Sequence, residues 1–311
     1  MNAARGAYSA FLTLLAPVYL ARLWWRGRIE PLYRQALGER FGRYRGAPGQ
    51  GFVWVHAVSL GETRAASALV EALRLALPAM RLLLTHGTAT GREAGHELLR
   101  DGDVQAWLPY DTPAATRRFM MKFRPSVGVL METEIWPNLI DAAQRAGVPM
   151  VLANARLSEK SRLKGERLAA LIRPAVEALS LVLAQTDADA RRLRRGGARA
   201  GGGGGNLKFD LQADVALVER GRAWRRAIGR PVLLAASSRE GEEAPLLAAW
   251  KDVPAPRPLL VIVPRHPQRF DEVAALVARE GFTSVRRSSF AEVPPPGAGA
   301  ADVWIGDSMR E

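Results

Sequence analysis

Acidic side chains follow two apolar segments of the sequence at the points where each predicted strand ends. Glu62 lies just after the segment Phe52–Val58, and Glu132 and Glu134 come directly after Val127–Met131. The carboxyl ends of parallel strands meet at one edge of a sheet, where ligands of doubly wound folds bind. Paired carboxylates there suit general-base catalysis on a hydroxyl and stabilisation of an oxocarbenium-like centre.

The three carboxylates differ in how readily a structural role explains them. A glutamate in the first turn of a helix is favoured by the helix dipole, so Glu62 alone is weak evidence for catalysis. Glu132 and Glu134 stand in a turn with Trp136-Pro137 and have no evident packing purpose. The second pair therefore indicates a site more strongly than Glu62 does.

Polar turns recur in the second half of the chain, each after a predicted strand. They contain Ser237-Ser238, Pro264-Arg265 and Gly306–Met309, and Lys208 lies near the predicted domain junction. Hydroxyls, backbone N–H groups and an arginine can hold a phosphate. Together these turns favour a nucleotide site.

Strand-like apolar runs alternate with helical patterns along most of the chain, which predicts doubly wound parallel sheets. Helices are expected at Glu62–Leu77, from Trp136-Pro137, at Gly241–Trp250 and at Asp271–Arg279. Further strands are expected at Leu82–Thr85, Pro149–Ala153, Leu181–Ala184, Val232–Ala236, Leu259–Val263 and Val303–Ile305. The glycine run Gly201–Gly205 is expected to be a linker, because glycine at this density disfavours a strand.

The composition excludes several kinds of site and partner. The chain has 311 residues, no cysteine and a net charge of +13, so disulfides and thiolate zinc sites are excluded. Its four histidines lack metal-ligand spacing. His56 and His86 stand at or near strand ends and are expected to be structural, with a place in the lining of the crevice as the alternative. The basic run Arg191–Arg195 is expected to be a solvated helix face, and no nucleic-acid partner is predicted.

The basic charge is concentrated beside the most apolar stretch of the chain. Residues 1–45 hold eight arginines and two glutamates, around the apolar segment Ala7–Ala21. That segment is shorter than the roughly 20 residues of a membrane span, and Pro17 is expected to interrupt it. Trp24 and Trp25 next to arginines are typical of a helix at an anionic membrane surface. The alternative is a buried N-terminal helix of a soluble fold.

At these residues the chain resembles the Kdo (3-deoxy-D-manno-octulosonic acid) transferases of lipopolysaccharide synthesis, which are GT-B glycosyltransferases. Order and spacing agree over essentially the whole chain. The matching segments are Tyr33 with Gly38–Gly42, His56–Glu62, Leu108–Asp111, Met131–Leu139, Ala153–Ser158, Asn206–Asp210, Glu240–Glu243, Val263–Phe270 and Gly306–Met309.

The resemblance implies an α/β fold with two Rossmann-like doubly wound domains, and an inverting transfer of Kdo from CMP-Kdo to a lipid A precursor. It implies that Glu62 is the general base, that Glu132 and Glu134 lie near the transition state, and that Lys208 stabilises developing charge. It places CMP-Kdo on the second domain, and it implies no metal and no cofactor. The implied donor contacts are Pro264, Arg265, Met309, Arg310 and Glu311, and the polar turn after the strand Val232–Ala236 adds Ser237 to them.

The domains expected on this basis are a membrane-associated helix at 1–30, an acceptor domain at 31–210 and a partial CMP-sugar domain at 211–311. The expected location is the cytoplasmic face of the bacterial inner membrane. Family members continue past the last residue here, so the second domain is expected to be incomplete; Arg310 replaces a usual glycine, and Gly201–Gly205 replaces a strand-like segment. A fragment, a frame-shifted gene or a decayed copy would each fit, and an inactive remnant that binds only membrane or acceptor is the alternative function.

Overall fold

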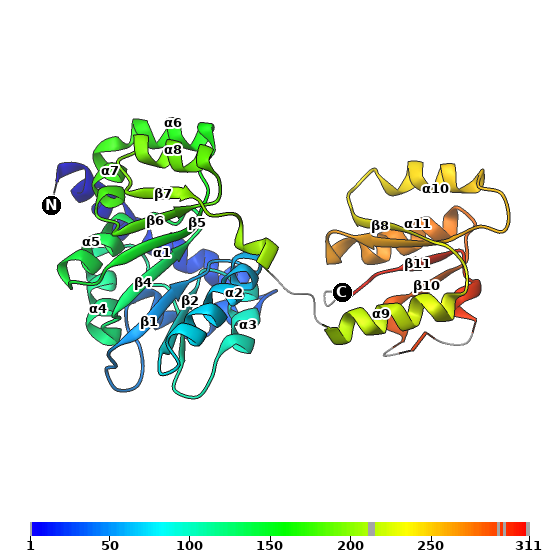
Figure 1. The fold of residues 1–311 in the computed structure, drawn as a ribbon, viewed down its shortest axis with the longest axis horizontal. Coiled ribbons are helices and arrows are strands. Elements are labelled where there is room, and N and C mark those ends of the chain that lie inside the picture. Colours follow the sequence, from blue (N-terminus) through cyan, green and yellow to red (C-terminus); the bar gives the residue numbers. More distant parts are fainter. Residues whose placement is uncertain (1, 211–214, 291–292, 295–296, 309–311) are drawn as a thin grey trace. The chain divides into compact units, whose positions relative to one another are not determined.

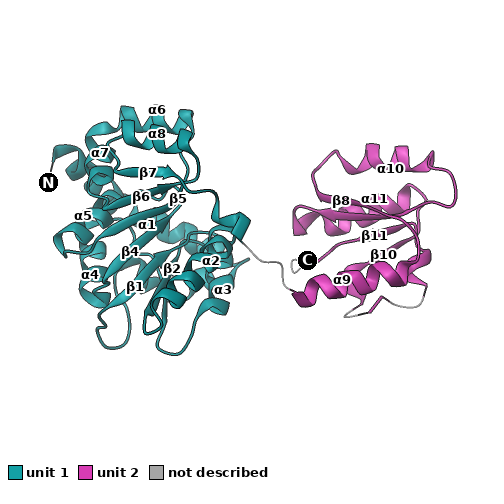
Figure 2. Ribbon diagram, viewed as in Figure 1, with its two compact units in different colours: residues 1–211 teal, residues 212–311 magenta. Residues whose placement is uncertain are grey.

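A computed structural model describes residues 2–210, 215–290, 293–294 and 297–308 of the chain. The chain divides into two compact units, residues 1–211 and residues 212–311 (Figures 1 and 2). The first unit includes the N-terminal helix that the sequence set apart as residues 1–30.

The first unit is built on a seven-stranded sheet in the order β3-β2-β1-β4-β5-β6-β7, and every neighbouring pair is parallel. The strand order reverses beside β1, so the crevice of the doubly wound fold opens at the carboxyl ends of β1 and β4. The strands are β1 Phe52–His56, β2 Arg81–His86, β3 Val104–Trp107, β4 Val127–Met131, β5 Met150–Ala155, β6 Leu181–Ala184 and β7 Ala200–Gly203.

Helices cover both faces of this sheet. Neighbouring residues of a strand point to opposite faces, and here both sets are apolar and need to be buried. Trp54 and Leu130 pack with Phe119 in one core, while Val55 and Met131 belong to the other. The α-helices of the unit are α1 Ala3–Arg26, α2 Leu60–Ala76, α3 Ala89–Gly95, α4 Pro113–Phe123, α5 Pro137–Arg145, α6 Glu159–Arg167, α7 Ala169–Glu177 and α8 Asp187–Arg195. The 3₁₀ turns are η1 Pro31–Arg34, η2 Leu37–Phe41, η3 His96–Leu98 and η4 Leu207–Asp210.

The glycine run is not a linker, and this prediction was wrong. Residues 200–203 form the edge strand β7, which pairs in parallel with β6. A Cβ on Gly203 would lie 2.7 Å from the backbone nitrogen of Asp187, so only glycine fits against the start of α8. The Gly203 N–H donates to Asp187 Oδ1 at 2.8 Å, and Arg194 donates to the carbonyls of Ala200 and Gly201. Tertiary contacts therefore stabilise a strand that glycine's own preference disfavours.

Pro17 does not interrupt the N-terminal helix, which corrects a second prediction. Helix α1 runs through it for 24 residues. Proline removes one backbone N–H, and an exposed helix face tolerates this loss because the freed Thr13 carbonyl can be hydrated. By length and hydropathy α1 is able to cross a membrane, a property shared with core helices and signal sequences.

The second unit has a four-stranded parallel sheet in the order β10-β11-β9-β8. Its strands are β8 Val232–Ser238, β9 Leu259–Pro264, β10 Ser284–Arg286 and β11 Val303–Ile305. Its helices are α9 Val215–Ile228, α10 Glu243–Lys251 and α11 Phe270–Arg279, with the 3₁₀ turns η5 Pro267–Arg269, η6 Arg287–Ser289 and η7 Ala298–Ala300. Leu260 and Ile262 pack with α10 and α11 on one face, and Leu259 packs with Trp304 on the other. The α/β class with parallel sheets is thereby confirmed in both units.

Candidate active site

Four side chains predicted from the sequence lie together at the carboxyl edge of the first sheet. Glu62 follows β1, Glu132 and Glu134 follow β4, and Lys208 comes from the turn η4, which packs against α2. The charges of Glu132 and Lys208 both act on the Glu62 carboxyl, and those of Glu62 and Glu132 act on Glu134. Segments up to 146 positions apart in the sequence therefore converge on one charged cluster.

Glu62 is held by the start of its own helix. Ser59 caps α2, and its hydroxyl donates to Glu62 Oε1 at 3.1 Å while the Val58 N–H donates to Oε2 at 2.9 Å. This arrangement resembles a capping box, with the carboxylate bound to the N–H of the residue before the N-cap, so the glutamate has a structural role whatever its chemistry. Burial raises the pKa of the Glu62 carboxyl and outweighs the opposing effect of these two hydrogen bonds. A raised pKa makes the carboxylate a stronger base toward a hydroxyl.

Glu132 and Asn154 both adopt left-handed backbone conformations, with φ of 58° and 54°. Such angles are uncommon outside glycine and cluster at functional sites. The Glu132 N–H donates to the carbonyl of Ala153 at 2.9 Å, which ties the turn after β4 to the end of β5. The backbone strain at these two strand ends lies beside the charged cluster.

Lys208 reaches the cluster through two contacts. Its ammonium donates to Glu132 Oε1 at 3.0 Å, and the neighbouring Leu207 N–H donates to Asn154 Oδ1 at 3.2 Å. Asn154 thus anchors the turn that presents the lysine. Asn154 was not predicted as a site residue, although an asparagine at a strand end is a recognisable signal because it tolerates left-handed angles.

Glu134 is the most perturbed carboxyl of the cluster. Burial raises its pKa to about 7, the negative charges of Glu62 and Glu132 add to the increase, and a hydrogen bond from Trp136 opposes it. The Trp136 indole N–H donates to Glu134 Oε2 at 2.8 Å. Near neutral pH this carboxyl is therefore partly protonated, which limits the negative charge beside Glu62.

The histidines behind the site are structural, as predicted. His56 is fully buried with its pKa lowered to about 3, and that of His86 is lowered to about 4, in both cases mainly by burial. His56 Nδ1 lies 3.0 Å from the Thr85 carbonyl, and His86 Nδ1 lies 3.0 Å from the Ala57 carbonyl. Both rings are neutral in the native state and connect β1 to β2.

The predicted donor residues of the second unit lie at strand ends of its own sheet. Ser237 is exposed at the end of β8 with φ of 59°, Pro264 is buried at the end of β9, and Arg265 is exposed just beyond it. The Arg265 N–H donates to the carbonyl of Ser238 at 3.0 Å, so the two strand ends are joined. Met309, Arg310 and Glu311 lie outside the described residues.

An ion pair links the segments that follow β8 and β9. Glu243 is buried, and Arg269 donates to both of its carboxylate oxygens at 2.8 and 3.0 Å. The Ser238 hydroxyl donates to the same carboxylate at 2.7 Å. Glu243 is therefore saturated by protein donors and acts as a structural link. Among the residues described, no group of three or more metal-ligating acids or histidines lies close enough to hold a metal ion.

Two Rossmann-like α/β units with parallel sheets, and carboxylates at a strand-end crevice, are the architecture of GT-B glycosyltransferases. A UDP-GlcNAc 2-epimerase from Neisseria meningitidis bound to UDP-GlcNAc shares this fold, with a TM-score of 0.53 and 14% identity over 83% of this chain and 72% of that chain. Residues 35–211 match the family model of 3-deoxy-D-manno-octulosonic-acid transferase (kdotransferase).

Curated relatives agree with the family model. The 3-deoxy-D-manno-octulosonic acid transferase of Bordetella pertussis is 46% identical over 99% of this chain and 74% of its own length. The enzyme of the same name from Haemophilus influenzae is 34% identical over 98% of this chain and 72% of its own. The chain belongs to the Kdo transferase family and is by class a glycosyltransferase.

Proposed function

We propose that this chain transfers Kdo from CMP-Kdo to a hydroxyl of a lipid A precursor, with inversion at the anomeric carbon. The observation that carries the proposal is the cluster of Glu62, Glu132, Glu134 and Lys208 in a chain of the Kdo transferase family. A base with a raised pKa, a partly protonated neighbour and a fixed cation are the groups that this reaction needs.

In the proposed reaction, ionised Glu62 accepts the proton of the acceptor hydroxyl as its oxygen bonds to the anomeric carbon of Kdo. The bond from that carbon to the phosphate oxygen breaks, and CMP leaves with the electron pair. Attack from the face opposite CMP inverts the centre. Glu132 keeps Lys208 in place, and the lysine charge stabilises the negative charge that develops.

The donor is assigned to the second unit, where Ser237, Pro264 and Arg265 border adjoining strand ends. Met309, Arg310 and Glu311 are proposed as further donor contacts. The phosphodiester bond of a CMP-sugar is already activated toward cleavage, so the proposed mechanism uses no metal and no cofactor.

The test is a transfer assay on the purified chain with CMP-Kdo and a tetra-acylated lipid A precursor, with the product identified by mass. We expect a product heavier by Kdo and release of CMP. The alternative function, an inactive remnant that binds membrane or acceptor alone, predicts retained acceptor binding without product. That result would overturn the enzymatic proposal for this chain.

We further propose that the protein works at the cytoplasmic face of the inner membrane, with α1 lying in the plane of the interface. Polar contacts fasten α1 along the first unit: Tyr8 donates to Asp111 at 2.9 Å and Ser9 to Asn138 at 3.1 Å. Tyr19 stacks on Tyr110 with ring centroids 4.1 Å apart. A helix docked over this length is arranged to lie beside the protein body rather than to leave it.

The outward face of α1 suits an anionic membrane surface. Phe11, Leu14 and Val18 are exposed at helical spacing, followed by exposed Trp24 and Trp25. The arginines around the tryptophans add attraction to anionic headgroups.

Liposome flotation tests the membrane proposal. Replacing Phe11, Leu14 and Val18 together by serine is expected to weaken flotation with phosphatidylglycerol vesicles about tenfold or more, because the variant loses apolar surface that the membrane interface buries. Replacing the exposed Leu75 and Leu77 by serine is the matched control. Equal flotation of the two variants would contradict the assigned face.

A further inference from the structure

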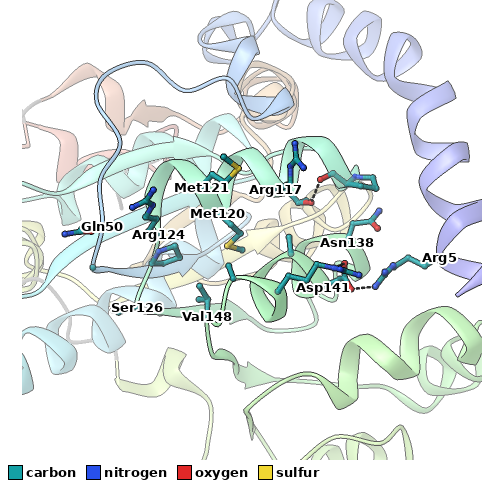
Figure 3. Close-up of a pocket in the computed structure, with 17 residues that line it drawn as sticks. Arg5, Gln50, Arg117, Met120, Met121, Arg124, Ser126, Asn138, Asp141 and Val148 are labelled. Carbon is teal, nitrogen blue, oxygen red and sulfur yellow. Dashed lines mark hydrogen bonds and ion pairs between the residues drawn. The ribbon is translucent and has the colours of Figure 1, made fainter. Parts of the chain in front are cut away.

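A large groove lies on the first unit away from the carboxylate cluster. Its volume is about 1070 Å³, and α4 and α5 form its two sides. Figure 3 shows Arg117, Met120, Met121 and Arg124 on one side, and Asp141 and Val148 on the other. Ligand pockets in proteins commonly have volumes of roughly 300–1,000 Å³, so the groove can hold a whole small amphiphile.

The groove reaches the amino-terminal edge of the sheet. Gly51 directly precedes β1, Ser126 precedes β4 and Val148 precedes β5, and all three line it. Glu62 and Glu132 follow the opposite ends of β1 and β4. A five-residue strand spans roughly 16 Å, so this end of the groove is separated from the carboxylates by about the length of a strand.

The groove combines an apolar lining with unpaired positive charge. Met121, which is 62% exposed, supplies most of the apolar surface, and the buried Met120 and Val148 lie behind it at the floor of the groove. In the described part of the chain, the guanidinium groups of Arg117 and Arg124 have no hydrogen-bond or ion-pair partner, and both side chains are exposed. Methionine adapts to irregular apolar ligands, and free guanidinium groups favour phosphate.

Two more arginines share one carboxylate. Arg5 of α1 and Arg145 of α5 both pair with Asp141, the one acidic side chain among the described residues of the lining. The contact between Arg5 and Asp141 also brings the start of α1 to the groove (Figure 3). The lining therefore keeps a net positive charge, and Arg117 and Arg124 are its arginines without an ion-pair partner in the part of the chain that the structure describes.

We propose that this groove binds one anionic phospholipid, with its headgroup attracted by Arg117 and Arg124 and an acyl chain on the apolar surface of Met121 and Ala142. An 11-residue helix such as α4 is about 16 Å long, which accommodates most of an extended acyl chain. The lipid would fix the first unit on the membrane at a second point besides the apolar face of α1.

A phospholipid fits these features better than the other candidates. A soluble anion would leave the methionine surface exposed to water. The acceptor of the transfer reaction must present its hydroxyl at Glu62, at the other edge of the sheet from Arg124. The inference thus concerns a separate site, and its failure would leave the proposed transfer reaction intact.

The test uses short-chain lipids below their micelle concentration, so that no membrane surface is present. Binding of dihexanoyl phosphatidylglycerol to the 311-residue chain is measured by titration calorimetry. Dihexanoyl phosphatidylcholine tests the role of net charge, and glycerol 3-phosphate tests the role of the chains. We expect saturable binding with one site for phosphatidylglycerol and at least about tenfold weaker binding for the other two.

Variants locate the site. Arg117→Glu and Arg124→Glu should each weaken phosphatidylglycerol binding about tenfold or more. Arg118→Glu makes the same charge change on the same helix but lies outside the lining, so it should leave binding unchanged. Ala146→Trp fills the groove from an exposed helix end and should block binding without disturbing the core.

Four outcomes would overturn the inference. These are equal binding of phosphatidylcholine, equal binding of glycerol 3-phosphate, unchanged binding by Arg117→Glu and Ala146→Trp, and displacement of the lipid by a lipid A precursor. The last outcome would assign the groove to the acceptor. Thermal melting of each variant checks that a loss of binding does not reflect unfolding.

Discussion

Lys208 and Glu132 form an ion pair of 3.0 Å across 76 positions of sequence, at the carboxyl edge of the first sheet. The lysine is 45% exposed and the glutamate 26% exposed, so the pair is worth little to stability. The ion pair instead places the ammonium group of Lys208 beside Glu62.

Replacing Glu62 separates its chemistry from its capping role. Glu62→Gln retains an acceptor oxygen for the Val58 N–H but cannot take a proton, so turnover should fall by roughly 10²- to 10⁴-fold with a small change in stability. Glu62→Ala should lose the same activity and also about 1 kcal/mol of stability with the capping contact. Transfer rate and denaturant unfolding measure the two effects. Glu71→Gln, on the exposed face of α2, is the control, and turnover retained by Glu62→Gln would refute the base.

Asn154 is expected to act through Lys208. Asn154→Gly keeps the left-handed backbone at no steric cost but removes the oxygen that holds the Leu207 N–H. We expect kcat to fall about tenfold with little change in KM, because misplacement of a charged group affects mainly the transition state. Asn154→Ala should show the same kinetic loss and be about 1 kcal/mol less stable than the glycine variant, owing to strain. Full kcat in Asn154→Gly would show that the anchor is dispensable.

Glu134 should make stability depend on pH. Its carboxyl titrates near 4.5 when unfolded and at about 7 in the native state. Between these values the native state binds more protons than the unfolded state, so its contribution is fully present below pH 4.5 and is lost as the pH rises through 7. The loss is on the order of 3 kcal/mol, from about 1.4 kcal/mol per unit of displacement.

Urea unfolding at several pH values checks this, since Glu134→Gln should flatten the decline. Glu71→Gln should leave it unchanged. An equal decline in the glutamine variant would mean that other groups cause it.

Gly203 should not tolerate a side chain, whereas Gly201 in the same strand should. A Cβ on Gly203 would meet the Asp187 nitrogen at 2.7 Å, whereas one on Gly201 would lie 3.8 Å from the Val182 carbonyl. Gly203→Ala is therefore expected to lower the free energy of unfolding by roughly 1–3 kcal/mol, because neighbouring backbone must move. Gly201→Ala should be neutral or slightly stabilising. Equal thermal stability of the two variants would contradict the close approach at Gly203.

Part of the fold and of the candidate active site could be predicted from the sequence alone. The strands β1 and β4 are continuous apolar runs, since strands buried on both faces of a sheet need apolar residues throughout. Acidic residues after those runs pointed to Glu62, Glu132 and Glu134, because the carboxyl ends of parallel strands meet. The short strands β3 and β10 were missed, because Val104–Trp107 and Ser284–Arg286 are of mixed polarity and give no period.

Only the tertiary structure decided the rest. The sequence places Lys208 far from Glu132, and the strand assignment of Ala200–Gly203 runs against glycine's own preference. Both depend on contacts between segments distant in sequence: the hydrogen bond from the Leu207 N–H to Asn154, and the close approach of Gly203 to the start of α8. Local propensity is worth about 1 kcal/mol per residue, and packing and hydrogen bonding of this kind outweigh it.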